Sequence, residues 1–176
     1  TDTGYQRVMV FDASVSNLDS YDTAIHVFGQ EDFSGNSAMA GNSIPDNYGF
    51  ESPKSVDYDS QRELLYVGDD YRIYIFDIST LQDYPEASNL LGVSEVLSGD
   101  CTTTSMSFCS TEGLAYSQTT QQLYTSSFYH NRVLGFDLSV IENQEPATQI
   151  IGQPNYTSSN RSEEHTSELQ SLTNLV

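Results

Sequence analysis

The feature that most constrains the fold is a β-type hexapeptide that occurs three times along the chain. It reads RVMVFD at Arg7–Asp12, RIYIFD at Arg72–Asp77 and RVLGFD at Arg132–Asp137. A unit that recurs at long intervals is typical of a repeat architecture, in which each unit packs on its neighbours. One arginine and one aspartate per unit are therefore expected to be structural. These residues are Arg7, Arg72 and Arg132, and Asp12, Asp77 and Asp137.

Two further phrases recur around the hexapeptide and divide each unit into short β-rich runs. A phrase containing Gly-Gln follows it as AIHVFGQEDF (Ala24–Phe33) and ATQIIGQPNY (Ala147–Tyr156), and Asn89–Leu97 is a decayed copy without the Gln. Another phrase precedes it at Ser55–Asp70 and Gly113–Ser127. Each unit thus reads as four strands separated by Gly, Asn, Asp, Ser and Gln.

The second hexapeptide predicts a strand that is buried on both faces. Because side chains alternate along a strand, Ile73 and Ile75 face one side while Tyr74 and Phe76 face the other. Such a strand needs cover on both faces, which blades packed face to face around an axis supply. The alternative is a β-sandwich whose strands resemble one another by chance, and the matched order of the phrases argues against it.

The predicted fold is all-β, a partial β-propeller of about two and a half four-stranded blades within residues 1–160. We expect Ser55–Asp77 and Gly113–Asp137 each to form three consecutive antiparallel strands and to superpose as neighbouring blades. Because closed propellers have about 4–8 blades, the chain is expected to be a fragment at both ends. The blade parts are expected at about 1–36, 50–97 and 110–156.

The phrases resemble the NHL repeat, and the Gly-Gln phrase is similar to that of bacterial NHL-repeat proteins of the extracellular or envelope type. The resemblance spans Tyr5–Asn160. It departs at Gly92, which lacks the Gln that follows Gly29 and Gly152. The resemblance implies a β-propeller, and the absence of Trp from the chain separates it from WD40 propellers, whose blades carry a Trp-Asp dipeptide.

Residues 161–176 are predicted to be a non-native tail. RSEEHTSELQS at Arg161–Ser171 resembles a sequencing-adapter oligonucleotide translated in one frame, and the LTNLV that follows fits its continuation. The alternative is a short surface helix that carries Glu163, Glu164 and Glu168. An assembly artefact was never selected to pack here, so we expect the tail to make almost no apolar contact with the strands.

The charge of the chain limits its partners. The formal net charge is -19, and Lys54 is the single lysine. So acidic a surface repels phosphate backbones and anionic lipids, which disfavours nucleic acid and membrane attachment. No membrane-inserting segment is expected, and the expected partner is a protein, a peptide or a glycan.

Cys101 and Cys109 are the only cysteines and lie in a Thr/Ser-rich loop. Their spacing fits a disulfide that closes a small surface loop, and this would place the protein in an extracellular or periplasmic compartment. Two free thiols are the alternative. A zinc site would need further ligands nearby, for which only His26 and His130 are available ahead of the tail.

No catalytic, cofactor-binding or metal-binding motif is recognised in the sequence. His130 precedes a repeated arginine in a turn that is expected at the rim of a blade, so it is the candidate for a binding role. The acidic pairs Asp57/Asp59 and Asp69/Asp70 offer oxygen ligands for Ca²⁺, but they lack the spacing of a calcium loop. Asp69 is expected instead to bond backbone amides of its own turn.

Two function classes remain open. The first is a non-catalytic binding scaffold, with specificity in the loops Ser34–Gly49 and Val93–Thr111, which differ between copies. The second is a propeller hydrolase or lyase, similar to lactonases or amidating lyases, with an axial metal held partly by blades outside the chain. The second class needs ligands on successive innermost strands. SVDYD offers acids and GLAYS offers none, so the sequence favours binding over catalysis.

Overall fold

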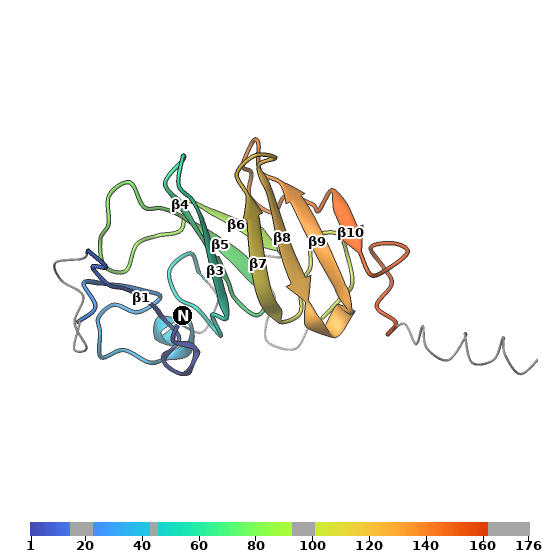
Figure 1. The fold of residues 1–176 in the computed structure, drawn as a ribbon. Helices are drawn as coiled ribbons and strands as arrows, with labels where there is room; N and C mark the ends of the chain where they lie inside the picture. Colours follow the sequence, from blue (N-terminus) through green and yellow to red (C-terminus); the bar gives the residue numbers. More distant parts are fainter. Residues whose placement is uncertain (15–22, 43–45, 93–100, 162–176) are drawn as a thin grey trace, which may run out of the picture.

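The repeated phrases form the strands of three antiparallel sheets (Figure 1). The computed structural model describes residues 1–14, 23–42, 46–92 and 101–161, and over these residues the chain is all-β with three short 3-10 turns. The elements are η1 (Thr3–Tyr5), β1 (Val8–Val10), β2 (His26–Phe28), η2 (Ala38–Gly41), β3 (Ser55–Asp59), β4 (Leu64–Gly68), β5 (Arg72–Asp77), β6 (Asn89–Gly92), β7 (Thr111–Ser117), β8 (Gln122–Ser127), η3 (Phe128–His130), β9 (Arg132–Asp137) and β10 (Gln149–Ile151).

Two of the sheets have four strands in chain order, β3-β4-β5-β6 and β7-β8-β9-β10, and the first sheet pairs β1 with β2. The prediction of three consecutive antiparallel strands over Ser55–Asp77 and Gly113–Asp137 is confirmed. The two copies also share a register, since Tyr66 pairs with Ile75 and Tyr124 pairs with Gly135. No sheet closes on itself among the described residues.

The middle sheet is covered on both faces, as its alternating pattern predicts (Figure 1). Ile73 and Ile75 belong to a buried cluster with Phe136 of the third sheet. Tyr74 and Phe76 belong to a second cluster with residues of the first sheet and the loop ahead of β3. Full burial of an aliphatic or aromatic side chain contributes about 1.5–3 kcal/mol, so each sheet depends on its neighbours for its core.

The glutamine of the Gly-Gln phrase ties two loops together. The Gln30 side-chain amide donates to the carbonyls of Gln6 (3.1 Å) and Ser37 (2.8 Å). Gln153 makes the same pair of bonds at 3.1 and 2.7 Å, the first of them to Asn131. Gln6 and Asn131 both have left-handed backbone and both precede the repeated arginine. The phrase therefore recurs because it fixes the entry to the hexapeptide strand.

The repeated arginine is held by the end of the same phrase. Arg7 Nη1 donates to the carbonyl of Phe33 (2.5 Å), and Arg132 Nη1 donates to the carbonyl of Tyr156 (2.6 Å). Arg72 is buried like Arg132. The guanidinium groups of Arg7 and Arg132 thus tie the start of the hexapeptide strand to the end of the Gly-Gln phrase.

The repeated aspartate closes the turn that follows the hexapeptide. In each unit its Oδ1 accepts the backbone amide of the serine two residues later, the bonding pattern of an Asx turn. The pairs are Asp12 with Ser14 (2.9 Å), Asp77 with Ser79 (2.9 Å) and Asp137 with Ser139 (3.0 Å).

Successive sheets are linked by a contact that we call the edge joint. A loop of the following sheet hydrogen-bonds the outer edge of the outermost strand. In the first joint Asp83 Oδ1 accepts the Val27 amide (3.1 Å), and the Tyr84 amide donates to the Val27 carbonyl (2.8 Å). The strand edge is thereby covered, which protects it from pairing elsewhere. The second joint repeats these two bonds between Leu90 and the pair Asn143 and Gln144, at 2.9 and 2.8 Å.

The predictions for the tail and for the loop Val93–Thr111 fall at least partly outside the described residues. The tail is described only at Arg161, so its expected lack of packing over 162–176 is not addressed by the structure. Of the loop Val93–Thr111, residues 93–100 also lie outside, whereas 101–111 are described.

Replacing Gly29 by alanine is expected to destabilise the fold by about 2–4 kcal/mol. Gly29 has a φ of +87°, and an added Cβ would lie 2.2 Å from Phe50 Cδ2 and 2.9 Å from the Gln6 carbonyl oxygen. Gly113→Ala is the control, because its nearest neighbour, Ser126 Oγ, lies at 3.6 Å. Urea denaturation of both variants checks the prediction, and equal midpoints would contradict it.

Candidate functional site

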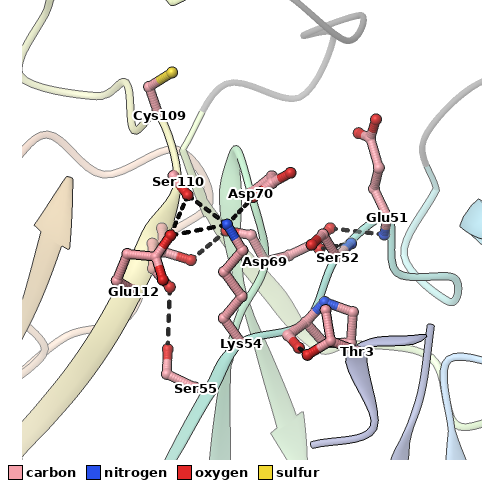
Figure 2. A network of polar contacts seen from close by, with 12 residues as sticks. Thr3, Glu51, Ser52, Lys54, Ser55, Asp69, Asp70, Cys109, Ser110 and Glu112 are labelled. Atoms are coloured by element: carbon pink, nitrogen blue, oxygen red, sulfur yellow. Dashed lines mark hydrogen bonds and ion pairs between the residues drawn. The ribbon is translucent and has the colours of Figure 1, made fainter. Parts of the chain in front are cut away.

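Four loops meet at one end of the middle and third sheets, which we call the loop end. They comprise residues 50–54 ahead of β3, 69–71 between β4 and β5, 107–110 ahead of β7, and 128–131 between β8 and β9. Backbone bonds join them, since the Ser110 amide donates to the Asp70 carbonyl (2.9 Å). Figure 2 shows part of this end, with Lys54 between residues of the neighbouring loops.

The loop end is crosslinked by a disulfide. Cys101 and Cys109 are bonded, with their Cα atoms 5.5 Å apart. The loop is also held by His130, whose Nε2 lies 2.9 Å from the Cys101 carbonyl oxygen and whose Nδ1 lies 3.0 Å from Ser127 Oγ. A carbonyl can only accept, so Nε2 carries the proton and Nδ1 accepts from the serine.

His130 therefore supports the disulfide loop through hydrogen bonds. Its side chain is buried, and this burial lowers its pKa below the ordinary value, so the imidazole is neutral near pH 7. Sequence reasoning expected this residue at an open rim, where a ligand could reach it. The structure instead puts it beneath the loop, with both ring nitrogens bonded to protein atoms.

Two aromatic side chains project from the turn that His130 ends. Phe128 and Tyr129 are 63% and 65% exposed, and their ring centroids lie 5.3 Å apart at 85°. Their backbone amides donate to the carbonyls of Ser110 (3.0 Å) and Cys109 (3.3 Å), so the turn is fixed to the disulfide loop. They line an open hollow of about 630 Å³ together with Ile151 and other residues of the third sheet.

Lys54 is the centre of a charged cluster at the same end (Figure 2). Its Nζ lies 2.8 Å from Asp70 Oδ1, 2.9 Å from Glu112 Oε1, and within hydrogen-bond reach of Ser110 Oγ. Partial burial acts to lower the pKa of Lys54, but the bonds to Asp70 and Glu112 outweigh it and the pKa is raised. A charged lysine cannot take a proton from a serine, so this lysine does not activate Ser110 as a nucleophile.

The carboxylate of Glu112 also works against proton transfer here. Hydrogen bonds from Ser110 and then Lys54 lower the pKa of Glu112, which makes it a weak base near neutrality. Lys54, Ser110 and Glu112 consequently form an ion-paired link between the segment ahead of β3 and the start of β7. No sequence signal identified this link, because Lys54 meets Ser110 and Glu112 only when the two sheets stack.

The acidic pairs considered for Ca²⁺ are engaged by protein donors. Asp69 is buried and accepts the amides of Glu51 (3.0 Å) and Ser52 (2.5 Å), in addition to that of Asp70 in its own turn. The expectation of bonds within the turn alone is thus incomplete. Among the described residues no three His, Cys, Asp or Glu side chains gather as a metal site would require.

Asp57 and Asp59 join the middle sheet to the third sheet. Asp57 Oδ2 accepts the amide of Tyr116 (2.6 Å), and Asp59 Oδ2 accepts from the hydroxyl of Tyr116 (2.8 Å) and from Arg62 Nε (2.6 Å). We call this contact the tyrosine seam. Sequence reasoning missed the roles of Arg62 and Tyr116. The three-residue spacing of Asp59 and Arg62 hints at a turn ion pair, but nothing in the sequence indicates the cross-sheet tyrosine.

His26 is paired with a loop of the neighbouring sheet. Its Nδ1 lies 3.2 Å from Asp83 Oδ1. It is far along the chain from Cys101 and Cys109, whose sulfurs are bonded to each other. The described residues therefore offer no set of zinc ligands around these two cysteines.

Over the described part of the chain, no helix has the length and apolar character needed to cross a membrane. A scan against models of protein families finds no match to the chain, and a search among curated proteins finds none either. The function is therefore inferred from the arrangement of the chain's own residues.

Proposed function

We propose that the chain belongs to a non-catalytic β-propeller of the NHL type that binds a protein, peptide or glycan through its loop end. The repeated hexapeptide, the shared strand register and the two edge joints support a stack of equivalent blades. The loops at one end of such a stack are carried by a rigid scaffold, which is where recognition sites are commonly found.

The observation that carries the binding proposal is the exposed pair Phe128 and Tyr129 on a braced turn. Large aromatic side chains supply contact area with few rotatable bonds, so they lose little entropy on binding. The disulfide and His130 hold the loop beneath them. A site that is already ordered avoids part of the ordering cost that binding otherwise incurs.

The proposed partner class and compartment follow from charge and from the disulfide. A net charge of -19 supports a partner other than nucleic acid or an anionic membrane. A disulfide supports an extracellular or periplasmic location, since cytosolic thiols are kept reduced.

The double variant Phe128→Ala/Tyr129→Ala is expected to lose binding about tenfold or more for any ligand captured on arrays of glycans and peptides. Val140→Ala is the control, because Val140 is 67% exposed and follows β9, at the end of that strand opposite the turn that carries Phe128 and Tyr129. Affinities of the array hits, measured by titration calorimetry for all three proteins, check this. Equal losses in both variants would contradict the site, and hits that neither variant affects would place binding elsewhere.

A further inference from the structure

Among the described residues, the first sheet has fewer strand partners than the other two sheets. The hexapeptide strands β5 and β9 are each paired on both edges, whereas β2 is the one described strand that pairs with β1. The Val10 carbonyl accepts the Ile25 amide on the β2 side (2.8 Å). Because backbone groups alternate along a strand, the amides of Met9 and Phe11 point to the other edge. No described strand pairs with that edge.

The bridge between Asp2 and Arg7 determines the register that a strand along this edge would adopt. Asp2 and Arg7 form an antiparallel bridge, with bonds of 2.8 and 3.3 Å in the two directions. In the third sheet Ser127 pairs with Arg132 across a turn of the same length, and Ser127 is the last residue of β8. Asp2 therefore occupies the place of the last residue of a β8-type strand.

The side-chain groove beside this edge has the matching shape. A hollow of about 280 Å³ is lined mainly by apolar residues, among them Val10, Phe28, Val56, Tyr58 and Leu81. Val56 and Tyr58 of β3 are 44% and 59% exposed. Their equivalents in β7, Leu114 and Tyr116, pack against the core between the middle and third sheets. The exposed face of β3 is thus the unpaired half of a second tyrosine seam.

We propose that the free edge of β1 and this groove bind one β-hairpin that has the inner-strand sequence pattern of the chain itself, the pattern of Ser55–Val67. The incoming hairpin would extend the first sheet by two strands and meet Tyr58 as β3 meets Tyr116. The inference goes beyond the proposed function, because the loop end takes no part in it.

The seam also determines which hairpin fits best. Asp57, Asp59 and Arg62 reach Tyr116 in the existing seam, so a hairpin that carries their equivalents reaches Tyr58 in the same way. The other inner hairpin, Gly113–Thr125, has Ala, Ser and Thr at these positions. It can add strands to β1 but cannot make the side-chain bonds to the tyrosine.

The test uses three synthetic peptides added to the full chain: SVDYDSQRELLYV, GLAYSQTTQQLYT and a scrambled form of the first. Binding is measured by fluorescence anisotropy at about 1 M salt, where a Debye length of about 3 Å suppresses repulsion from the acidic chain. We expect the first peptide to bind about tenfold more tightly than the second, and the scrambled peptide not to bind. Tyr58→Phe should weaken the first peptide about five- to tenfold and leave the second unchanged.

Hydrogen exchange identifies the edge. Bound peptide should protect the amides of Met9 and Phe11 and leave those of Val8 and Val10, on the β2 side, unaltered. The proposal is overturned if neither peptide binds the folded chain, or if the scrambled peptide binds equally. It is also overturned if sedimentation shows self-association that Tyr58→Ser abolishes, since the groove would then hold a second copy.

Discussion

Replacing Arg132 by methionine is expected to destabilise the fold by about 3–5 kcal/mol. Arg132 is buried and donates to three carbonyls, those of Tyr156 (2.6 Å), Thr104 (2.7 Å) and Ser107 (2.9 Å). Methionine keeps the apolar stem but leaves these acceptors without a donor, and each unsatisfied buried group costs about 1–3 kcal/mol. Urea denaturation monitored by circular dichroism measures the effect.

The matched control is Arg7→Met, at the equivalent place in the first unit. Arg7 pairs with the partly exposed Asp2 and reaches the carbonyl of the exposed Phe33, so water replaces its bonds at low cost. A loss of about 1 kcal/mol or less is expected there. Equal losses at Arg7 and Arg132 would show that burial of the arginine is not what makes it important.

Replacing Asp59 by asparagine is expected to cost about 2–4 kcal/mol at neutral pH. Asp59 is buried and holds Arg62, the Tyr116 hydroxyl and two amides of the β3–β4 turn. Removal of one charge leaves the half-buried Arg62 without its ion-pair partner. Asp57→Asn serves as the control, because it keeps an oxygen for the Tyr116 amide and should cost less than about 1 kcal/mol.

The Asp59 contribution depends on pH in a defined direction. Burial acts to raise the pKa of Asp59, but bonds from Arg62 and Tyr116 outweigh it and hold the pKa far below the ordinary value. A carboxyl with a depressed folded-state pKa stabilises fully above its unfolded pKa, about 3.9, and loses this as the pH falls further. The difference in unfolding free energy between the native chain and Asp59→Asn should therefore be constant above about pH 5 and shrink at pH 3. A constant difference down to pH 3 would refute the ion-pair explanation.

The strands and their faces could be predicted from the sequence because they depend on local periodicity. Ile73 and Tyr74 face opposite sides of one strand. The hexapeptide also occurs three times, and each copy predicts a strand at its own position. The same sequence did not indicate what the recurring Gln30 and Gln153 do, because their bonds run to backbone carbonyls, which any residue supplies.

The candidate site was harder to predict because its parts come from different units. Cys101 and Cys109 lie in one loop, and the sequence indicated a bond between them. Lys54 meets Glu112 only when two sheets stack, and no local pattern encodes that approach. His130 illustrates a further limit, since a histidine in a turn reads as accessible until the Cys101 carbonyl covers it.

The edge joint gives the stack a direction of growth. Each joint has two unlike halves, a strand edge such as that of Val27 and a loop such as that carrying Asp83. Because both joints join unlike halves, the units associate head to tail, and each unit presents its own strand edge to the next. In the third sheet Ile150 is the equivalent of Val27 and Leu90. It pairs with Leu134 in the same way that Leu90 pairs with Tyr74. The array of sheets is therefore polar. The outer strand edge of a unit determines both the position and the orientation in which another unit can attach to it.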